Sequence, residues 1–176
     1  MKANQPLLAA THPTPAGPIT LITGPDGVCA AGFTDDLALV SALRGPVHLR
    51  ADVRLVADAG DASKAVLAWA EGDVDAPLAV GAALEGTDFQ RSVCAALRTI
   101  PAGRPLTYTG LAAAAGRPAA VRAAARGCAT NRVSLFVPCH RVVRSGGAVG
   151  GFLWGPTVKE ALLAHEADLT PTSQRS

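Results

Sequence analysis

Two runs of β-favouring apolar residues lie near the start of the chain and are separated by a strong turn signal. Residues 19–23 predict one strand, and Gly24-Pro25-Asp26-Gly27 predicts a turn into a second strand over residues 28–33. Residues 1–16 are rich in Pro and Ala and are expected to be loose. The early part of the chain therefore predicts two strands joined by a tight turn.

Helical periodicity begins after the second predicted strand. Apolar residues recur on one face over residues 35–44, and a second helical segment is predicted over residues 62–72. Residues 45–60 carry no clear pattern. Residues 76–84 are consistent with either a strand or a linker, and they lead out of the first half of the chain.

A capping box marks the first helix of the second half. The Thr87 side chain can cap this helix, and Gln90 stands three residues on, where its side chain can return the bond. From Phe89, apolar residues recur at i, i+4 and i+8, which predicts an amphipathic helix. The helix is expected to continue to about residue 100, where Pro101-Ala102-Gly103 stops it.

A helix-turn-helix pattern follows. Thr107 can cap a helix over residues 108–115, which Gly116 ends. Pro118 is expected in the first turn of a third helix, which runs to about residue 130. Two short helices joined by a glycine-containing turn are typical of a helix-turn-helix.

The second helix of this pattern is unusually rich in alanine between residues 119 and 127. Small side chains permit close packing against neighbouring helices, which is the simplest interpretation. The alternative is a helix slim enough to enter a DNA groove, with Arg122 projecting from it. The residues alone leave both interpretations open.

Charge is distributed unevenly along the chain. Residues 1–85 carry 5 basic and 10 acidic side chains, whereas residues 86–176 carry 11 basic and 4 acidic ones. A basic half suggests a polyanionic partner, with nucleic acid as the first candidate. A solvated arginine-rich surface is the alternative.

The length and composition narrow the class of protein further. The 176 residues suit one domain or two small domains that share a core. No apolar stretch is long enough to span a membrane and no secretory signal is evident, so we expect a soluble, cytoplasmic protein without membrane contact. The four cysteines and four histidines show no spacing typical of a zinc site, so no metal is expected.

The stretch Pro138-Cys139-His140-Arg141 carries the strongest chemical signal. It follows an apolar run over residues 134–137, which is consistent with a strand, and precedes a glycine-rich loop over residues 145–151. A helix-like segment then ends in Glu166. A thiol, an imidazole and a carboxylate in one site can make a thiolate near neutral pH, which a cysteine nucleophile needs. A cysteine hydrolase, a redox thiol and an inert buried thiol also fit these residues.

These motifs, in their order and spacing, resemble the O6-alkylguanine-DNA alkyltransferases, the methylated-DNA–protein-cysteine methyltransferase family. Residues 136–143, Phe-Val-Pro-Cys-His-Arg-Val-Val, resemble the active-site signature of that family. The resemblance covers about residues 15–168, and residues 127–132 are similar to the bacterial adaptive-response or Ogt-type branch. The other segments that carry it are Gly17–Leu21, Gly27–Ala30, Gly86–Gln90, Pro105–Tyr108, Ala120–Ala123, Gly150–Gly155 and Lys159–Glu166.

The resemblance implies an α/β fold class with two domains. Residues 1–84 would form a small N-terminal ribonuclease-H-like α/β domain. Residues 85–176 would form a mostly helical C-terminal domain with a helix-turn-helix, which binds DNA and transfers the alkyl group. The resemblance also implies that the protein needs no cofactor and acts as a monomer.

The resemblance implies a role for each residue of the site. Cys139 would accept the alkyl group, His140 would act as a base through a bridging water, and Glu166 would orient His140. Asn131 would hold the turn before the active site, and Tyr108 would push the 3′ phosphate and donate a hydrogen bond to the departing guanine. From the residues alone, Asn131 equally fits an ordinary helix end and Tyr108 a buried aromatic.

The implied partner is double-stranded DNA that contains alkylated bases, bound through the minor groove with the damaged nucleotide flipped out. Flipping is needed because the O6-alkyl carbon cannot be reached inside a duplex. Arg122 would insert into the base stack in place of the flipped nucleotide. The residues implied to contact DNA are Arg122, Tyr108, Ala123, Arg126, Arg141, Gly150 and Phe152.

The resulting functional prediction is DNA repair by irreversible transfer of a methyl or small alkyl group from O6-alkylguanine to Cys139, once per molecule. O4-alkylthymine is a second candidate substrate. The alternatives are a non-catalytic sensor of alkylated DNA, a class that lacks the acceptor cysteine, and a helix-turn-helix regulator with an incidental thiol.

Two residues depart from the family pattern. Leu153 stands where relatives often have Ser or Arg, so no side chain there can donate to the base, and Cys94 replaces an aromatic.

Overall fold

In the computed structural model, residues 5–46 and 48–169 are described, and they form two compact units. The first unit contains the described residues up to Ala83 together with Arg132–Phe136. The second contains Leu84–Asn131 and the described residues from Val137 onward. The sequence does not predict the return of Arg132–Phe136 to the first unit. The division into domains at residues 84 and 85 remains a proposal.

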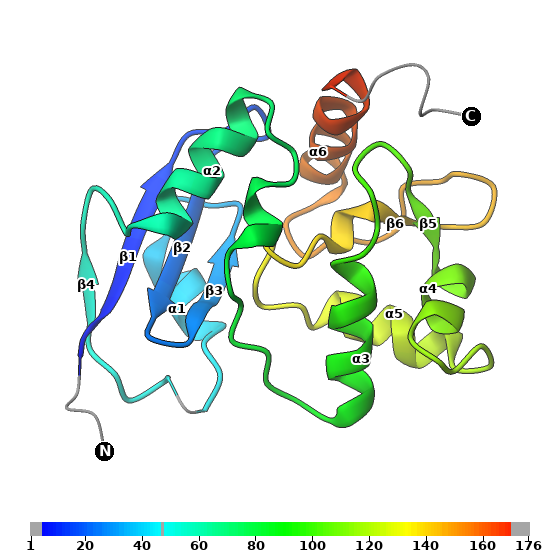
Figure 1. The fold of residues 1–176 in the computed structure, drawn as a ribbon, viewed down its shortest axis with the longest axis horizontal. Helices are drawn as coiled ribbons and strands as arrows, with labels where there is room; N and C mark the ends of the chain where they lie inside the picture. Colours follow the sequence, from blue (N-terminus) through cyan, green and yellow to red (C-terminus); the bar gives the residue numbers. More distant parts are fainter. Residues whose placement is uncertain (1–4, 47, 170–176) are drawn as a thin grey trace. The chain divides into compact units, whose positions relative to one another are not determined.

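A four-stranded mixed sheet forms the centre of the first unit (Figure 1). Strands β1 to β4 comprise Leu7–His12, Ile19–Gly24, Gly27–Gly32 and Val53–Leu55. Their order is β3-β2-β1-β4, in which β1 and β4 are parallel and the other neighbours are antiparallel. Gly27 closes the turn between β2 and β3 with a φ of 105°, which glycine adopts without steric cost. Both strands predicted from the sequence are confirmed.

The expectation that residues 1–16 are loose is wrong for β1, and residues 1–4 lie outside the described residues. Ala9 and Ala10 of β1 are completely buried, and the strand pairs with both β2 and β4. Alanine has a low intrinsic preference for strands, but pairing on both edges and burial of the side chains override that preference. The alanines therefore mark a central strand at a tightly packed position.

Two α-helices and one 3₁₀ helix complete the first unit. Helices α1 and α2 and the 3₁₀ helix η1 comprise Leu37–Ala42, Asp61–Glu71 and Ala76–Ala79. Both predicted α-helices are confirmed, although α1 is shorter than expected. The Asp36 side chain accepts hydrogen bonds from the backbone N–H groups of Ala38 and Leu39, which sets the start of α1. After η1, Ala82 forms a single parallel bridge to Val28.

The second unit is mostly helical and has one short parallel strand pair (Figure 1). Thr87 and Gln90 make both bonds of the predicted capping box at the start of its first helix, α3. The parallel strands β5 and β6 pair Leu106 with Val142 and Thr107 with Val143. The elements α3, β5, α4, α5, η2, β6 and α6 comprise Asp88–Leu97, Leu106–Thr107, Tyr108–Ala114, Val121–Ala129, Cys139–Arg141, Val142–Val143 and Pro156–Leu169.

Helices α4 and α5 form the predicted helix-turn-helix. Gly116 lies in the turn with a φ of 82°. The placement of Pro118 in the first turn of the next helix is wrong, because α5 begins only at Val121 and Pro118 belongs to the connecting turn. A Cβ on Gly127 of α5 would lie 2.8 Å from a methyl group of Val93, so α5 packs tightly on α3. One face of α5 thus agrees with the packing interpretation of its small residues.

The mixed α/β fold class predicted from the sequence is confirmed. Within the part of the chain that the structure describes, each helix is too short or too polar to cross a lipid bilayer.

Candidate active site

The apolar run before Cys139 is buried but does not form a strand. Residues 133–137 are all buried, and the bridge between Val133 and Ala31 is an isolated one. Leu135 has a φ of 73°, in the left-handed region that side-chain-bearing residues rarely adopt. The strand expected over residues 134–137 is therefore wrong, because the side chains are buried as in a strand while the backbone turns at Leu135.

Cys139 is the first residue of η2, and Asn131 holds its sulfur. Asn131 Nδ2 donates to Cys139 Sγ at 3.0 Å and to the Val137 carbonyl oxygen at 2.8 Å. Burial raises the pKa of Cys139 to about 11, outweighing the Asn131 hydrogen bond and the positive charge of Lys159, which both lower it. The thiol is therefore protonated at neutral pH, and formation of the expected thiolate requires a base.

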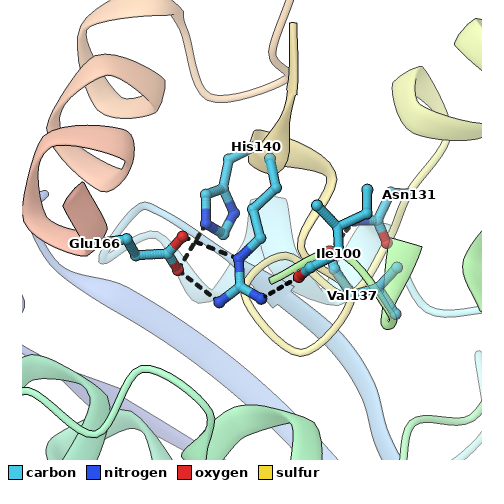
Figure 2. A network of polar contacts seen from close by, with 6 residues as sticks. Ile100, Asn131, Val137, His140 and Glu166 are labelled. Carbon is cyan, nitrogen blue, oxygen red and sulfur yellow. Dashed lines mark hydrogen bonds and ion pairs between the residues drawn. The ribbon is translucent and has the colours of Figure 1, made fainter. Parts of the chain in front are cut away.

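His140 and Arg141 follow Cys139, and both contact the Glu166 carboxylate, which Figure 2 shows beside His140. His140 Nε2 lies 3.0 Å from Glu166 Oε1. Arg141 donates from Nη2 to Oε1 at 2.8 Å and from Nε to Oε2 at 2.9 Å. The remaining terminal nitrogen of Arg141, Nη1, donates to the Ile100 carbonyl oxygen at 2.7 Å. His140, Arg141 and Glu166 are all buried, so the whole network is shielded from solvent.

The protonation of this network follows from its contacts. Burial alone would raise the pKa of Glu166, but the charges and hydrogen bonds of His140 and Arg141 outweigh burial and lower that pKa to about 2. Glu166 is therefore ionised throughout the physiological pH range. Nδ1 of His140 is also buried, and it has no hydrogen-bond partner among the described residues.

A cavity of about 590 Å³ opens beside Cys139 in the second unit. Its volume lies in the range of about 300–1,000 Å³ that is typical of small-molecule sites. Helix α5 forms one wall and the glycine-rich loop forms another. The lining residues are Tyr108, Val121, Arg122, Ala125, Cys128, Ala129, Cys139, Arg144, Gly151, Phe152 and Leu153. Most of these side chains are apolar.

Tyr108 stands at the start of α4 and contacts the glycine-rich loop. A Cβ added to Gly150 would lie 3.2 Å from the Tyr108 hydroxyl, and Gly150 has a φ of 75°. Burial raises the pKa of Tyr108, and Cys128 and Cys139 raise it further, whereas Arg144 lowers it. The phenol therefore stays protonated and can donate a hydrogen bond into the cavity.

The structure brings most of the predicted site residues together. Asn131 contacts Cys139, and His140 contacts Glu166. Arg122, Tyr108 and Phe152 line the cavity, and Arg122 is exposed on α5. Ala123 and Arg126 are exposed on the same helix but do not line the cavity. Leu153, the departure from the family pattern, also lines the cavity and is half exposed. Among the described residues, no group of three or more His, Cys, Asp or Glu side chains is arranged to hold a metal ion.

One expectation is overturned, because the structure does not place Arg141 at a DNA-binding surface. The residue is 2% exposed, and its side-chain donors bind Glu166 and the Ile100 carbonyl group. In the sequence, Arg141 cannot be distinguished from the exposed arginines of the basic half. Its burial becomes evident only from its contact with Glu166, which lies 25 residues further along the chain.

Lys159 is a site residue that the sequence reasoning missed. It is completely buried on α6, where Nζ donates to the Gly151 carbonyl oxygen at 3.2 Å and lies 5.9 Å from the centre of the Tyr108 ring. Burial lowers the pKa of Lys159, whereas Cys139 and Cys128 raise it. A signal was present in the sequence. Lys159, Leu162 and Glu166 recur at i, i+3 and i+7, so two charged residues occupy the buried stripe of one helix.

Comparison with known proteins shows which proteins the site-bearing half of the chain is similar to. Residues 88–168 match the family described as 6-O-methylguanine DNA methyltransferase, DNA binding domain. The bifunctional transcriptional activator/DNA repair enzyme Ada of Escherichia coli is 48% identical over 94 residues, which are 53% of this chain and 27% of that protein. A methylated-DNA–protein-cysteine methyltransferase of Salmonella typhimurium is 48% identical over 84 residues, 48% of this chain and 49% of that protein. The chain thus spans about half or less of the length of these curated relatives.

Solved structures extend the similarity to nearly the whole chain. The O6-methylguanine methyltransferase of Mycobacterium tuberculosis superposes with a TM-score of 0.74 at 29% identity, covering 94% of this chain and 96% of that one. A structure of Mycobacterium tuberculosis OGT in complex with DNA gives 0.73 at 28% identity, covering 96% and 98%. The fold and the site define a protein with a buried cysteine beside a helix-turn-helix. Over residues 88–168 the chain matches the O6-methylguanine DNA methyltransferase family model, and over nearly its whole length its fold is similar to solved O6-methylguanine methyltransferases.

Proposed function

We propose that this protein repairs DNA by transferring a methyl or small alkyl group from O6 of guanine to Cys139, with O4-alkylthymine as a second substrate. One observation carries the proposal. The buried Cys139 thiol lines a cavity beside the helix-turn-helix, and the next residue is a histidine paired with an ionised carboxylate. The family match and the names of the relatives support the same reaction.

The proposed transfer needs no cofactor, because every proton and electron pair is accounted for by the protein and the base. His140 accepts the proton of Cys139 through a water at Nδ1, and the thiolate attacks the alkyl carbon. The carbon–sulfur bond forms as the carbon–oxygen bond breaks, and the electron pair of that bond stays on the guanine oxygen. The Tyr108 phenol donates a hydrogen bond to the leaving base, and the proton held by His140 returns to guanine. The product is a stable thioether, so each molecule reacts once.

The proposed partner is double-stranded DNA with alkylated bases, bound through the minor groove by a monomer in the cytoplasm. Helix α5 exposes Arg122, Ala123 and Arg126 on the face that does not pack against α3. Arg122 also lines the cavity. This position suits a side chain that replaces a flipped nucleotide while its base enters the cavity.

Intact-mass measurement after incubation with a methylated oligonucleotide tests the proposal. We expect a mass gain of one methyl group per protein molecule, and peptide mapping should place that group on Cys139. DNA binding without a mass gain would favour a non-catalytic sensor of alkylated DNA. A methyl group on Cys29, Cys94 or Cys128 would overturn the assignment of the acceptor.

A further inference from the structure

Arg141 is buried in the second unit with all three guanidinium nitrogens engaged. Nε and Nη2 bind the two oxygens of Glu166, and Nη1 binds the Ile100 carbonyl oxygen. The pair of bonds to Glu166 is the bidentate geometry that arginine, and not lysine, makes with a carboxylate. Arg141 therefore fixes both the position and the rotation of the Glu166 carboxylate.

Stability alone does not account for this arrangement. A buried ion pair is often no more stable than an apolar pair of similar volume, because both charges lose their hydration. The Glu166 carboxylate has a second task, however, since Oε1 also contacts His140 Nε2. An arginine and a histidine that are adjacent in the sequence thus share one carboxylate oxygen.

We propose that Arg141 is a positioning residue for the alkyl transfer, which holds Glu166 ionised and aimed at His140. This inference rests on the proposed function. An ionised carboxylate accepts a hydrogen bond, so its contact keeps the His140 proton on Nε2. Nδ1 then carries the lone pair, and it is the nitrogen without a partner among the described residues. Arg141 in this way selects the form of His140 that can accept a proton from Cys139.

Loss of Arg141 should raise the pKa of Glu166. Burial tends to raise the pKa of Glu166, and the interactions of this carboxylate with His140 and Arg141 of η2 oppose burial. Without Arg141 fewer interactions lower the pKa of Glu166, so Glu166 takes up a proton at a higher pH than in the wild type. A protonated carboxyl group donates to Nε2 and moves the His140 proton to Nδ1. The variant should therefore lose rate as the pH falls, over a range in which Glu166 of the wild type stays ionised.

Single-turnover methyl transfer by Arg141→Met, Arg141→Lys and Arg104→Met, measured from about pH 5.5 to about pH 9, tests this proposal. We expect Arg141→Met to be at least roughly tenfold slower at the upper end, within the 10²–10⁴-fold that general-base catalysis contributes, and to slow further towards acid pH. Arg141→Lys keeps the charge without the bidentate bonds, so it should be slower but keep the wild-type pH dependence. Arg104 is an exposed arginine of the same half, and at saturating DNA Arg104→Met should keep the wild-type rate and pH dependence.

Folding is controlled separately, because removal of Arg141 leaves a buried charge. Thermal unfolding and affinity for unmethylated duplex DNA are measured for each variant. Arg141→Met/Glu166→Gln removes both charges and should lack the acid loss of Arg141→Met. If Arg141→Met does not fold, Arg141→Lys decides the matter, since a wild-type rate for that variant would contradict the proposal.

A second reaction separates this inference from the proposed function. Iodoacetamide alkylates Cys139 with loss of iodide and needs neither DNA nor a flipped base. The acid loss of Arg141→Met should appear in this reaction as well, even if the wild type transferred no methyl group. A folded Arg141→Met that follows the wild-type pH profile in both reactions overturns the positioning role while leaving methyl transfer by the wild type intact.

Discussion

At the scale of single residues, Cys139 combines deep burial with a task that requires charge. Burial holds the pKa of this thiol at about 11, so only a small fraction is thiolate at neutral pH. Asn131 and Lys159 favour the thiolate, and the proposed base has its own buried carboxylate. In the proposed reaction, the thiol therefore becomes a nucleophile only when a base accepts its proton.

The assignment of the acceptor predicts the behaviour of Cys139→Ser. This variant should lose methyl transfer completely and keep its affinity for DNA, because an alcohol is a far weaker nucleophile than a thiol at neutral pH. Intact mass after incubation with methylated DNA measures the transfer, and a salt-dependent binding assay measures the affinity. Cys128→Ser is the matched control, since Cys128 lines the same cavity and should be dispensable as an acceptor. Residual transfer by Cys139→Ser would point to another acceptor.

Lys159 gives a prediction about pH. Its charge lowers the pKa of Cys139, so Lys159→Met should raise that pKa further above about 11. Below its pKa, the thiolate fraction falls tenfold for each unit by which the pKa rises. Alkylation of Cys139 by iodoacetamide should therefore slow at every pH between about 7 and about 9. Lys159→Arg keeps a positive charge and should recover part of the rate. Equal rates for Met and Lys at this position would show that the charge does not act on the thiol.

At the scale of elements, the sequence predicts helices more completely than strands. The capping box at Thr87 and the spacing of apolar residues locate α3, because both signals are local. The central strand β1 was missed, since its alanines become strand residues only through pairing on both edges. The run over residues 134–137 gave the opposite error, because its apolar pattern suggested a strand and the backbone instead turns at Leu135. The resemblance implies the contact of His140 with Glu166 and a turn held by Asn131, whereas the roles of Arg141 and Lys159 required the fold.

The contact between α3 and α5 predicts the effect of Gly127→Ala. Glycine inside a helix usually costs about 0.5–1 kcal/mol relative to alanine, so this substitution would ordinarily stabilise the protein. Here the new Cβ would meet the Val93 side chain at 2.8 Å, and overpacking of this kind costs about 1–3 kcal/mol. We therefore expect a lower free energy of unfolding, measured by denaturant titration. In a Val93→Ala background the clash is relieved, and the same Gly127→Ala substitution should become neutral or stabilising.

At the scale of the whole molecule, the two halves of the chain differ in charge. The first 85 residues carry twice as many acidic as basic side chains, and the remaining residues carry an excess of basic ones. DNA affinity should therefore depend on the second half and fall steeply with salt, as phosphate contacts release counterions. The arginines of this half are not equivalent, because Arg141 is buried, Arg126 is exposed, and Arg122 is exposed at the cavity.

This difference leads to the prediction for Arg122→Ala. If Arg122 fills the space of a flipped nucleotide, its loss should impair base extrusion more than initial binding. Repair of methylguanine in duplex DNA should then fall by a larger factor than reaction with free benzylguanine, for which nothing has to be flipped. Arg126→Ala provides the comparison, because it removes an exposed charge from the same helix away from the cavity. Its loss on duplex DNA should be recovered at saturating DNA, whereas that of Arg122→Ala should persist. An equal loss of Arg122→Ala on both substrates would mean that Arg122 supports the fold or the thiol, and the insertion role would have to be abandoned.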